Sequence, residues 1–439
     1  MRRLILFIVI SGLVAFCEEK KNNGAVMKLT LEEAKKIALQ ENPSLAITKA
    51  RIKAAAEGVN KEMANYWPSL DLSAGMTRIR DYATRPNRDF LNTTRYSAGA
   101  SATWLIFDGF QREFNVLSAE FSLTDAIQSD QDARRLLIKS VSTAFYSALL
   151  AQDNMDIAKE DADFNRILLD DAKKRHDGGV AKASEVKNFQ LKVQTAEANY
   201  VSSEKNWHIA IVALGRLLAI SRDEIWESLQ LVSPTVIPDE QYDFAKLYDY
   251  AIQHRPDLLA CNAKIQNCRE AINAARNQWF PKLTAFGDYG YERTHTARFN
   301  KHYDRNIDFG LKLTWNVFEG GKTSASISQA EANLVQALRE RDDLLRTLDS
   351  EIRQNLLTIQ SSRKQLQLQE ATLATAKEIR DLVHEEYLGG TATITRLNET
   401  QTDVTKAASE RSAAHIQLLN SIEELRVSTS ENLGESQAK

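Results

Sequence analysis

The segment at residues 319–324, Glu-Gly-Gly-Lys-Thr-Ser, is the part of the sequence most similar to a phosphate-binding loop. It follows a strand-like segment and opens a helix-like one, as a nucleotide-binding loop does. That motif also requires a glycine five residues before its Gly-Lys pair, and this position is Asn316. A similar turn occurs earlier in the chain, at residues 108–111, and it has no Lys-Thr or Lys-Ser pair. We therefore expect neither a nucleotide site nor any other cofactor.

The histidines and cysteines do not form a recognisable catalytic or metal-binding set. The seven histidines lack metal-ligand spacing, and we interpret His295 and His302 as part of a solvated loop. We find no catalytic triad and no acid–base pair of carboxylates. Cys261 and Cys268 are roughly 10 Å apart along a helix, too far for a disulfide, and are interpreted as buried structural thiols. The sequence thus predicts a protein that is not an enzyme and holds no metal.

The composition indicates long helices, which must position any functional residues. Glycine and proline are scarce, at 17 and 7 residues, whereas good helix formers dominate. The 56 Lys and Arg nearly balance 59 Asp and Glu, for a net charge of −3, which argues against nucleic-acid binding. Arg2 and Arg3 precede a short apolar run, so residues 1–17 are interpreted as a signal peptide.

The same sequence motifs occur twice in the chain, in the same order. Pro43 and Pro256 are 213 residues apart, as are the aromatic-Pro pairs that end at residues 68 and 281. The Trp-x-x-Phe-Asp/Glu-Gly segments that begin at residues 104 and 315, and the two Gly-Gly pairs, are separated by 211 residues. This order predicts an internal duplication. We expect a first structural repeat at 28–220, an inter-repeat linker at 221–243, a second repeat at 244–430 and a C-terminal tail at 431–439.

Each predicted repeat contains two segments with a period of two residues, at 69–79 and 96–107 and again at 283–293 and 307–318. Every odd residue from Ile307 to Val317 is apolar. Each segment approaches the ~10 residues that a tilted strand needs to cross a bilayer. We expect membrane strands, although a small soluble sheet with one face on a helix is an alternative. The intervening segments, 80–95 and 294–306, are polar and are expected to be surface loops.

Very long helices are expected at 110–177 and 323–388, with returning helices at 182–220 and 393–430. Each long helix would extend roughly 100 Å. A period of seven in the helix expected at 323–388 predicts coiled-coil packing. The polar companion positions of this helix suit a ring of helices around a wet interior. The apolar positions are Leu338, Leu345, Ile352, Ile359, Leu366 and Leu373.

Four strands cannot close a transmembrane barrel, and an open sheet in lipid would leave unpaired edges. Several copies must therefore share one barrel. With these motifs in this order, the whole mature chain resembles the TolC family of outer-membrane efflux proteins. The resemblance implies a mostly α-helical fold, with long antiparallel hairpins in an α-barrel and four strands per chain in a 12-stranded trimeric β-barrel. It also implies a homotrimer in the outer membrane that works with a periplasmic adaptor and an inner-membrane pump of RND or ABC type.

The resemblance further implies that the two Gly-Gly hairpins are periplasmic tips that form the aperture and meet the adaptor. Arg396 departs from the acid that the family often has, which suggests a Glu185–Arg396 contact that holds the tip shut. Cys17 is a possible lipidation site. A non-conducting structural periplasmic coiled-coil lipoprotein is the alternative function. The tip residues are Gly178, Gly179, Glu185, Gly389, Gly390, Arg396 and Glu399.

Overall fold

The computed structural model describes residues 27–82, 90–179, 182–220, 229–234, 242–295 and 298–431. Signal peptide 1–17, Cys17 and nearly all of the C-terminal tail lie outside these residues. The chain divides into two compact units. Unit 1 contains Met1–Ala38, Val141–Pro238 and Leu366–Ile416, and unit 2 contains Leu39–Ser140, Asp239–Gln365 and Gln417–Lys439.

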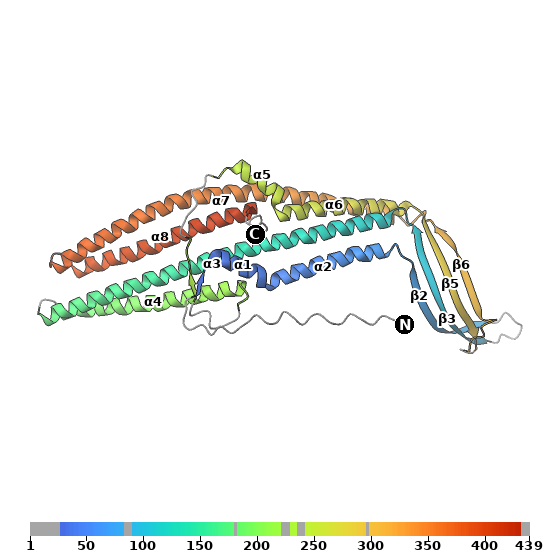
Figure 1. Ribbon diagram of the computed structural model, residues 1–439, viewed down its shortest axis with the longest axis horizontal. Helices are drawn as coiled ribbons and strands as arrows, with labels where there is room; N and C mark the ends of the chain where they lie inside the picture. The colour runs from blue at the N-terminus through green and yellow to red at the C-terminus, as the bar shows by residue number, and fades with distance from the viewer. Residues whose placement is uncertain are drawn as a thin grey trace, which may run out of the picture. The chain divides into compact units, whose positions relative to one another are not determined.

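One order of elements, namely two helices, two strands and two helices, occurs twice (Figure 1). In the first half these are α1 (Leu31–Glu41), α2 (Pro43–Ala64), β2 (Ser69–Tyr82), β3 (Phe90–Phe107), α3 (Gln111–Asp177) and α4 (Ala183–Leu217). In the second half they are α5 (Phe244–His254), α6 (Pro256–Arg276), β5 (Lys282–Thr294), β6 (Arg305–Thr314), α7 (Lys322–Leu388) and α8 (Ile394–Thr429). A 3₁₀ turn, η2 (Asn277–Trp279), follows α6.

Proline starts the second helix of each half. Pro43 and Pro256 occupy the first turn, where a missing N–H costs no hydrogen bond. The side chain of Asn42 caps α2 by accepting a 2.9 Å bond from the Ser44 backbone N–H. The short helices α1 and α5 therefore end just before these prolines.

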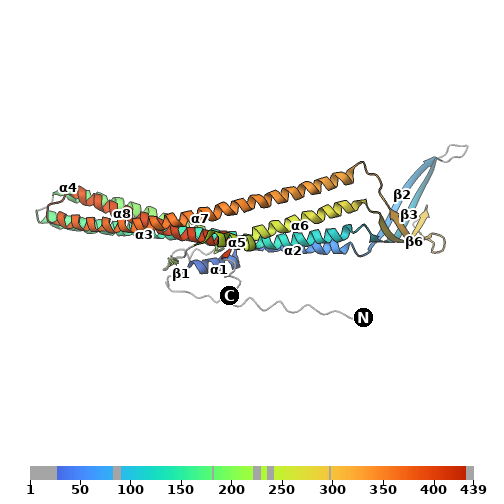
Figure 2. The same ribbon diagram turned by 90° about the horizontal axis from the view of Figure 1, so that it is seen from above.

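Unit 1 contains helical hairpins in which α4 returns along α3 and α8 returns along α7 (Figures 1 and 2). Arg166 of α3 pairs with Glu197 of α4 at 2.8 Å, and Arg411 of α8 pairs with Glu370 of α7 at 3.5 Å. The predicted period of seven in α7 faces inward, because all six of its apolar residues are at least half-buried. No described helix is both long and apolar enough to cross a membrane.

Unit 1 also contains a small parallel sheet that the sequence did not predict. β1 (Met27–Leu29) pairs with β4 (Leu229–Leu231), which lies inside the expected linker. The Gln152 side chain of α3 holds β4 by accepting from the Leu231 N–H at 3.1 Å and donating to its carbonyl at 3.3 Å. The expected linker is therefore partly ordered against the first half.

Unit 2 contains one antiparallel sheet in the order β2-β3-β5-β6, so the two halves contribute adjacent strand pairs. The four expected strands are present, with three ends displaced by three residues or more. β2 continues to Tyr82 instead of residue 79, so residues 80–82 and 90–95 of the expected surface loop belong to strands. β3 begins six residues earlier than predicted, at Phe90. β6 ends at Thr314 instead of residue 318, because Thr314 pairs with Lys282 and the next partner would be Pro281, which has no N–H to donate.

Candidate functional site

The four-stranded sheet has one apolar face that the described residues leave uncovered. Residues directly opposite in an antiparallel pair lie on the same face, so the register of the strands defines each face. Leu72, Ala100, Tyr289 and Ile307 form one row across all four strands. The exposed fraction reaches 83% for Leu72 and 84% for Phe309, which lies in the next row. Such a surface needs an apolar environment outside this chain.

The opposite face of the same sheet is polar. Its central row contains Asp71, Ser101, Asp288 and Asp308, paired in that order across the strands. The strands therefore have one apolar and one polar wall, the pattern of a sheet between lipid and water. The sequence predicted the alternation, but the carboxylate row was missed because it appears only once the four registers are known.

A buried arginine joins the first strand pair to α3. Arg112 donates to the carbonyls of Leu105 at 2.7 Å and Ile106 at 2.9 Å, and it pairs with Asp108 at 3.3 Å. The chain turns at Gly109, where φ is +73° and a side chain would collide with Phe280. Gly109 is therefore required both by the left-handed turn and by the close approach of Phe280.

Both Gly-Gly pairs form the expected hairpin turns in unit 1. The second glycine of each pair has a left-handed backbone, with φ of +77° at Gly179 and +80° at Gly390. The Gly178 N–H donates to the Lys174 carbonyl at 3.1 Å, and the Gly389 N–H donates to Glu385 at 2.9 Å. Each helix thus ends with its last carbonyls satisfied, and glycine supplies the turn.

The predicted aperture residues lie in the first turns after these hairpins. Glu185 is half-buried in α4, whereas Arg396 and Glu399 are exposed on α8. Within one chain Arg396 pairs with Glu399, at 3.6 Å, and no contact between Arg396 and Glu185 is formed by the described side chains. The proposed latch would therefore join hairpins of different chains.

A tyrosine that the sequence analysis missed connects the two hairpins. Tyr387 packs edge-on against Phe189 at 6.0 Å, and the Arg175 guanidinium lies 4.9 Å from its ring centre. Arg175 also donates to the Tyr387 carbonyl at 3.3 Å. Burial raises the pKa of the Tyr387 hydroxyl, and the nearby Glu185 carboxylate raises it further. The available signal was an aromatic residue two positions before the Gly389–Gly390 pair.

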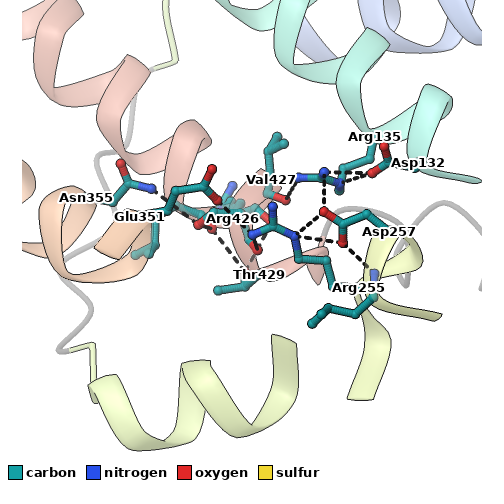
Figure 3. Close-up of polar contacts among 12 residues, drawn as sticks. Asp132, Arg135, Arg255, Asp257, Glu351, Asn355, Arg426, Val427 and Thr429 are labelled. Carbon is teal, nitrogen blue, oxygen red and sulfur yellow. Dashed lines mark hydrogen bonds and ion pairs between the residues drawn. The ribbon is translucent and has the colours of Figure 1, made fainter. Parts of the chain in front are cut away.

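Unit 2 contains a buried ion network that was also missed (Figure 3). Arg255 bonds both carboxylate oxygens of Asp257 at 2.9 Å and reaches Glu351 at 2.7 Å. Arg135 of α3 contacts Asp257 at 3.4 Å and Asp132 at 2.7 Å. The two arginines also donate to the carbonyls of Ser428 and Val427 at the end of α8, at 3.5 and 3.4 Å. The network ties four helices of unit 2 together where α6 begins.

The remaining cysteines are free thiols. Cys261 and Cys268 are half-buried, not fully buried as expected, because each lies at the edge where α6 meets α7. Burial raises the pKa of both thiols, which keeps them protonated and unreactive at neutral pH. No group of potential ligands for a metal ion occurs among the described side chains.

Comparison with known proteins gives three informative similarities. The family model described as "Outer membrane efflux protein" matches residues 35–219 and 247–430. The outer membrane protein TolC of Escherichia coli is 23% identical over 390 residues, which are 86% of this chain and 77% of TolC. The crystal structure of the CmeC outer membrane channel of Campylobacter jejuni is 18% identical with a TM-score of 0.78, over 99% of this chain and 97% of CmeC.

Proposed function

This chain belongs to the outer membrane efflux protein family, and we propose that it is the outer-membrane channel of a tripartite efflux or type I secretion system. The protein resides in the outer membrane, and its family is one of channels rather than enzymes. In this proposal it conducts substrates passively, from an inner-membrane pump of RND or ABC type through a periplasmic adaptor to the exterior. The adaptor would bind at the Gly178–Gly179 and Gly389–Gly390 hairpins.

The two-faced sheet with two free edges is the observation that supports this proposal most. Among the described strands, β2 and β6 each have one neighbour in the sheet, so one edge of each has backbone groups that no described strand pairs. Such groups are prohibitively costly in lipid, and closure with other copies removes them. Two copies would give eight strands, whose interior side chains fill, whereas three would give twelve and leave a pore. We therefore propose a homotrimer with a 12-stranded β-barrel.

The domain organisation proposed for this channel is the internal duplication. The repeats span 28–220 and 244–430 and are joined by the linker at 221–243. The repeated order of elements supports it, as does the separate match of each half to the family model. In this arrangement the long hairpins of three chains form an α-barrel that continues the pore.

Purified protein in planar lipid bilayers tests the function directly. We expect discrete conductance steps and a heat-modifiable oligomer band in detergent gels. A non-conducting coiled-coil lipoprotein would give neither. If the intact oligomer inserts into bilayers without conductance steps, the channel proposal is wrong.

Arg396→Glu is expected to raise the single-channel conductance of the closed protein. Glu185 and Arg396 are 211 residues apart and occupy matching turns of the two halves, so neighbouring hairpins in a ring bring them close. One exposed pair contributes only ~0–1 kcal/mol, but three equivalent contacts act together. The swap Glu185→Arg with Arg396→Glu should partly restore closure. Equal conductance of Arg396→Glu and the unchanged protein would refute the latch.

Epitope tags inserted in segments 80–95 and 294–306 are expected to be accessible on intact cells. Both segments include the connection between the strands of a pair, at the end of the sheet away from the helices, together with the adjoining strand ends. Parts of them, 83–89 and 296–297, lie outside the described residues. Antibody binding to unpermeabilised cells is the measurement, and a tag in the Gly389–Gly390 hairpin is the matched control. Detection of the loop tags only after permeabilisation would reverse the proposed orientation.

A further inference from the structure

The two faces of the four-stranded sheet differ in the sign of their charges. On the apolar face, every charged residue of the described strands is an arginine. These residues are Arg78 and Arg80 of β2, Arg293 of β5 and Arg305 of β6. The polar face carries charges of both signs, and its Arg95 is paired with Glu292 at 3.0 Å. The apolar face therefore presents cations without the acids that accompany them on the polar face.

The four arginines lie at the same end of the strands, away from the helices. Arg80 lies twelve residues after Pro68, which precedes β2. Arg293 lies twelve residues after Pro281, the equivalent proline of the second half. It is also ten residues beyond Leu283, the first apolar-face residue of β5. Because a tilted strand crosses a bilayer in about 10 residues, these arginines lie where the strands leave the membrane.

Tyrosines mark this boundary of the membrane. Tyr291 lies directly opposite Arg305 on the apolar face, and its hydroxyl is 2.9 Å from the hydroxyl of Tyr289. Tyrosine is enriched where a transmembrane strand passes from lipid to water. At the other end of the face Trp104 takes this place, and no described strand has a charged residue there. The cations are thus specific to one interface.

Arg293 and Arg305 are close neighbours on this face. Arg293 is two residues beyond Tyr291, the partner of Arg305, and such diagonal neighbours have Cβ atoms about 7–8 Å apart. Arg293 is paired with Asp304 at 3.3 Å. Arg305 is exposed and forms no ion pair with a described side chain. The same is true of Arg78 on β2. The described side chains therefore leave cations at this interface without a counter-charge.

We propose that this end of the apolar face binds the phosphate groups of anionic lipids in the outer leaflet. Arg293 and Arg305 would bind one headgroup beside Tyr291, and Arg78 with Arg80 a second. A guanidinium group donates two parallel N–H bonds to phosphate oxygens, so arginine suits this ligand better than lysine does. The leaflet follows from the proposed orientation of the channel, and the assignment rests on that function.

The site borders apolar surface, which favours a lipid over free phosphate. Ile307 follows Arg305 on the same face of β6 and is 52% exposed, and Phe309 comes next at 84%. Acyl chains that cover these side chains would hold a headgroup at the height of the arginines. Free phosphate would gain nothing from the apolar residues, because it has no apolar part to bury.

Native mass spectrometry of the intact oligomer in an uncharged detergent tests the site. The probes are dioleoyl phosphatidylglycerol, which is anionic, and dioleoyl phosphatidylcholine, which is zwitterionic. We expect tighter binding of phosphatidylglycerol. The double variant Arg78→Gln, Arg305→Gln should weaken this binding about fivefold at each headgroup, the effect of one cation near an anionic surface. Both side chains are exposed, so their replacement should leave the oligomer intact.

The matched control removes a cation from the other wall of the same strand. Lys312 of β6 lies on the polar face opposite Thr284, and Lys312→Gln should bind phosphatidylglycerol as the unchanged protein does. Arg305→Lys keeps the charge and should keep most of the preference for the anionic lipid. This variant also tests the site if the double variant fails to assemble, because a loss of the preference in Arg305→Lys would contradict binding through charge.

The outcomes separate the lipid site from the channel. Equal binding of the two lipids overturns the site, as does unchanged binding of phosphatidylglycerol in the double variant. Loss of the preference in Lys312→Gln alone also overturns it. Displacement of the lipid by an equal concentration of inorganic phosphate would show a site for free anions instead. In each of these cases conductance would still support the channel, whereas a protein that neither conducts nor forms a heat-modifiable oligomer overturns the proposed function and the site with it.

Discussion

Arg255→Met is expected to destabilise unit 2 by about 3 kcal/mol, near the lower end of the cost of breaking a buried ion pair. The Arg255 side chain is 4% exposed and is the closest counter-charge of Asp257, which is 18% exposed. Methionine keeps much of the volume but leaves this carboxylate without its bidentate partner. The lower end applies because Glu351, the second partner, is 40% exposed and regains water. The midpoint temperature for loss of helical circular dichroism in detergent should fall accordingly.

Arg353→Met is the matched control for this substitution. Arg353 of α7 also pairs with a carboxylate, Asp349 at 2.9 Å, and its guanidinium lies 4.0 Å from the centre of the Phe244 ring. Its side chain is 59% exposed, so water screens this ion pair and its contribution to stability is small. The double variant Arg255→Met, Asp257→Leu should regain part of the stability, since no unpaired charge stays buried. Equal melting of the two single variants would show that the network does not hold the helices.

The elements could be predicted where a short pattern decides them. Glycine at a left-handed turn acts locally, so the hairpins at Gly179 and Gly390 could be predicted from the sequence alone. The period of two located the strands for the same reason. The family model and the resemblance agree on what these elements build, an outer-membrane efflux protein.

The features that sequence analysis missed depend on residues that are distant in the chain. The three-residue strands β1 and β4 have too few residues for a period, and they pair across about 200 positions. The Arg255 network collects side chains from α3, α6 and α7 and carbonyls from α8. The early end of β6 follows from Pro281 in the neighbouring strand. Predicting each of these features requires the register of the strands or the packing of the helices. A local sequence pattern contains neither.

The aperture residues illustrate a different limit. The resemblance transferred positions such as Glu185 and Arg396, and they do follow the hairpin turns. Their contacts in one chain, however, are Tyr387 near Glu185 and Glu399 beside Arg396. A contact that closes a ring belongs to two chains, so neither the sequence pattern nor a single chain's packing can supply it. This is why conductance, and not stability, is the measurement for the latch.

Leu311→Lys is expected to prevent assembly of the oligomer in the outer membrane. Leu311 lies on the apolar face of β6 opposite Ala285, between Phe309 and Leu313, and it is 68% exposed in the single chain. Lysine on the lipid face near the middle of the bilayer costs ~2–4 kcal/mol per strand. A trimer would carry three such residues, a total of about 6–12 kcal/mol. The amount of heat-modifiable oligomer recovered from outer membranes should therefore fall steeply.

The control places the same charge on the other wall of the same sheet. Ser101→Lys lies on the polar face of β3, directly between Asp71 and Asp288 in the strand register, where water and two carboxylates receive the ammonium group. We expect this variant to assemble at the normal level. Normal assembly of Leu311→Lys would show that the apolar face does not meet lipid. Loss of assembly in Ser101→Lys alone would mean that the two walls are reversed, with the carboxylate row facing the membrane side of the barrel.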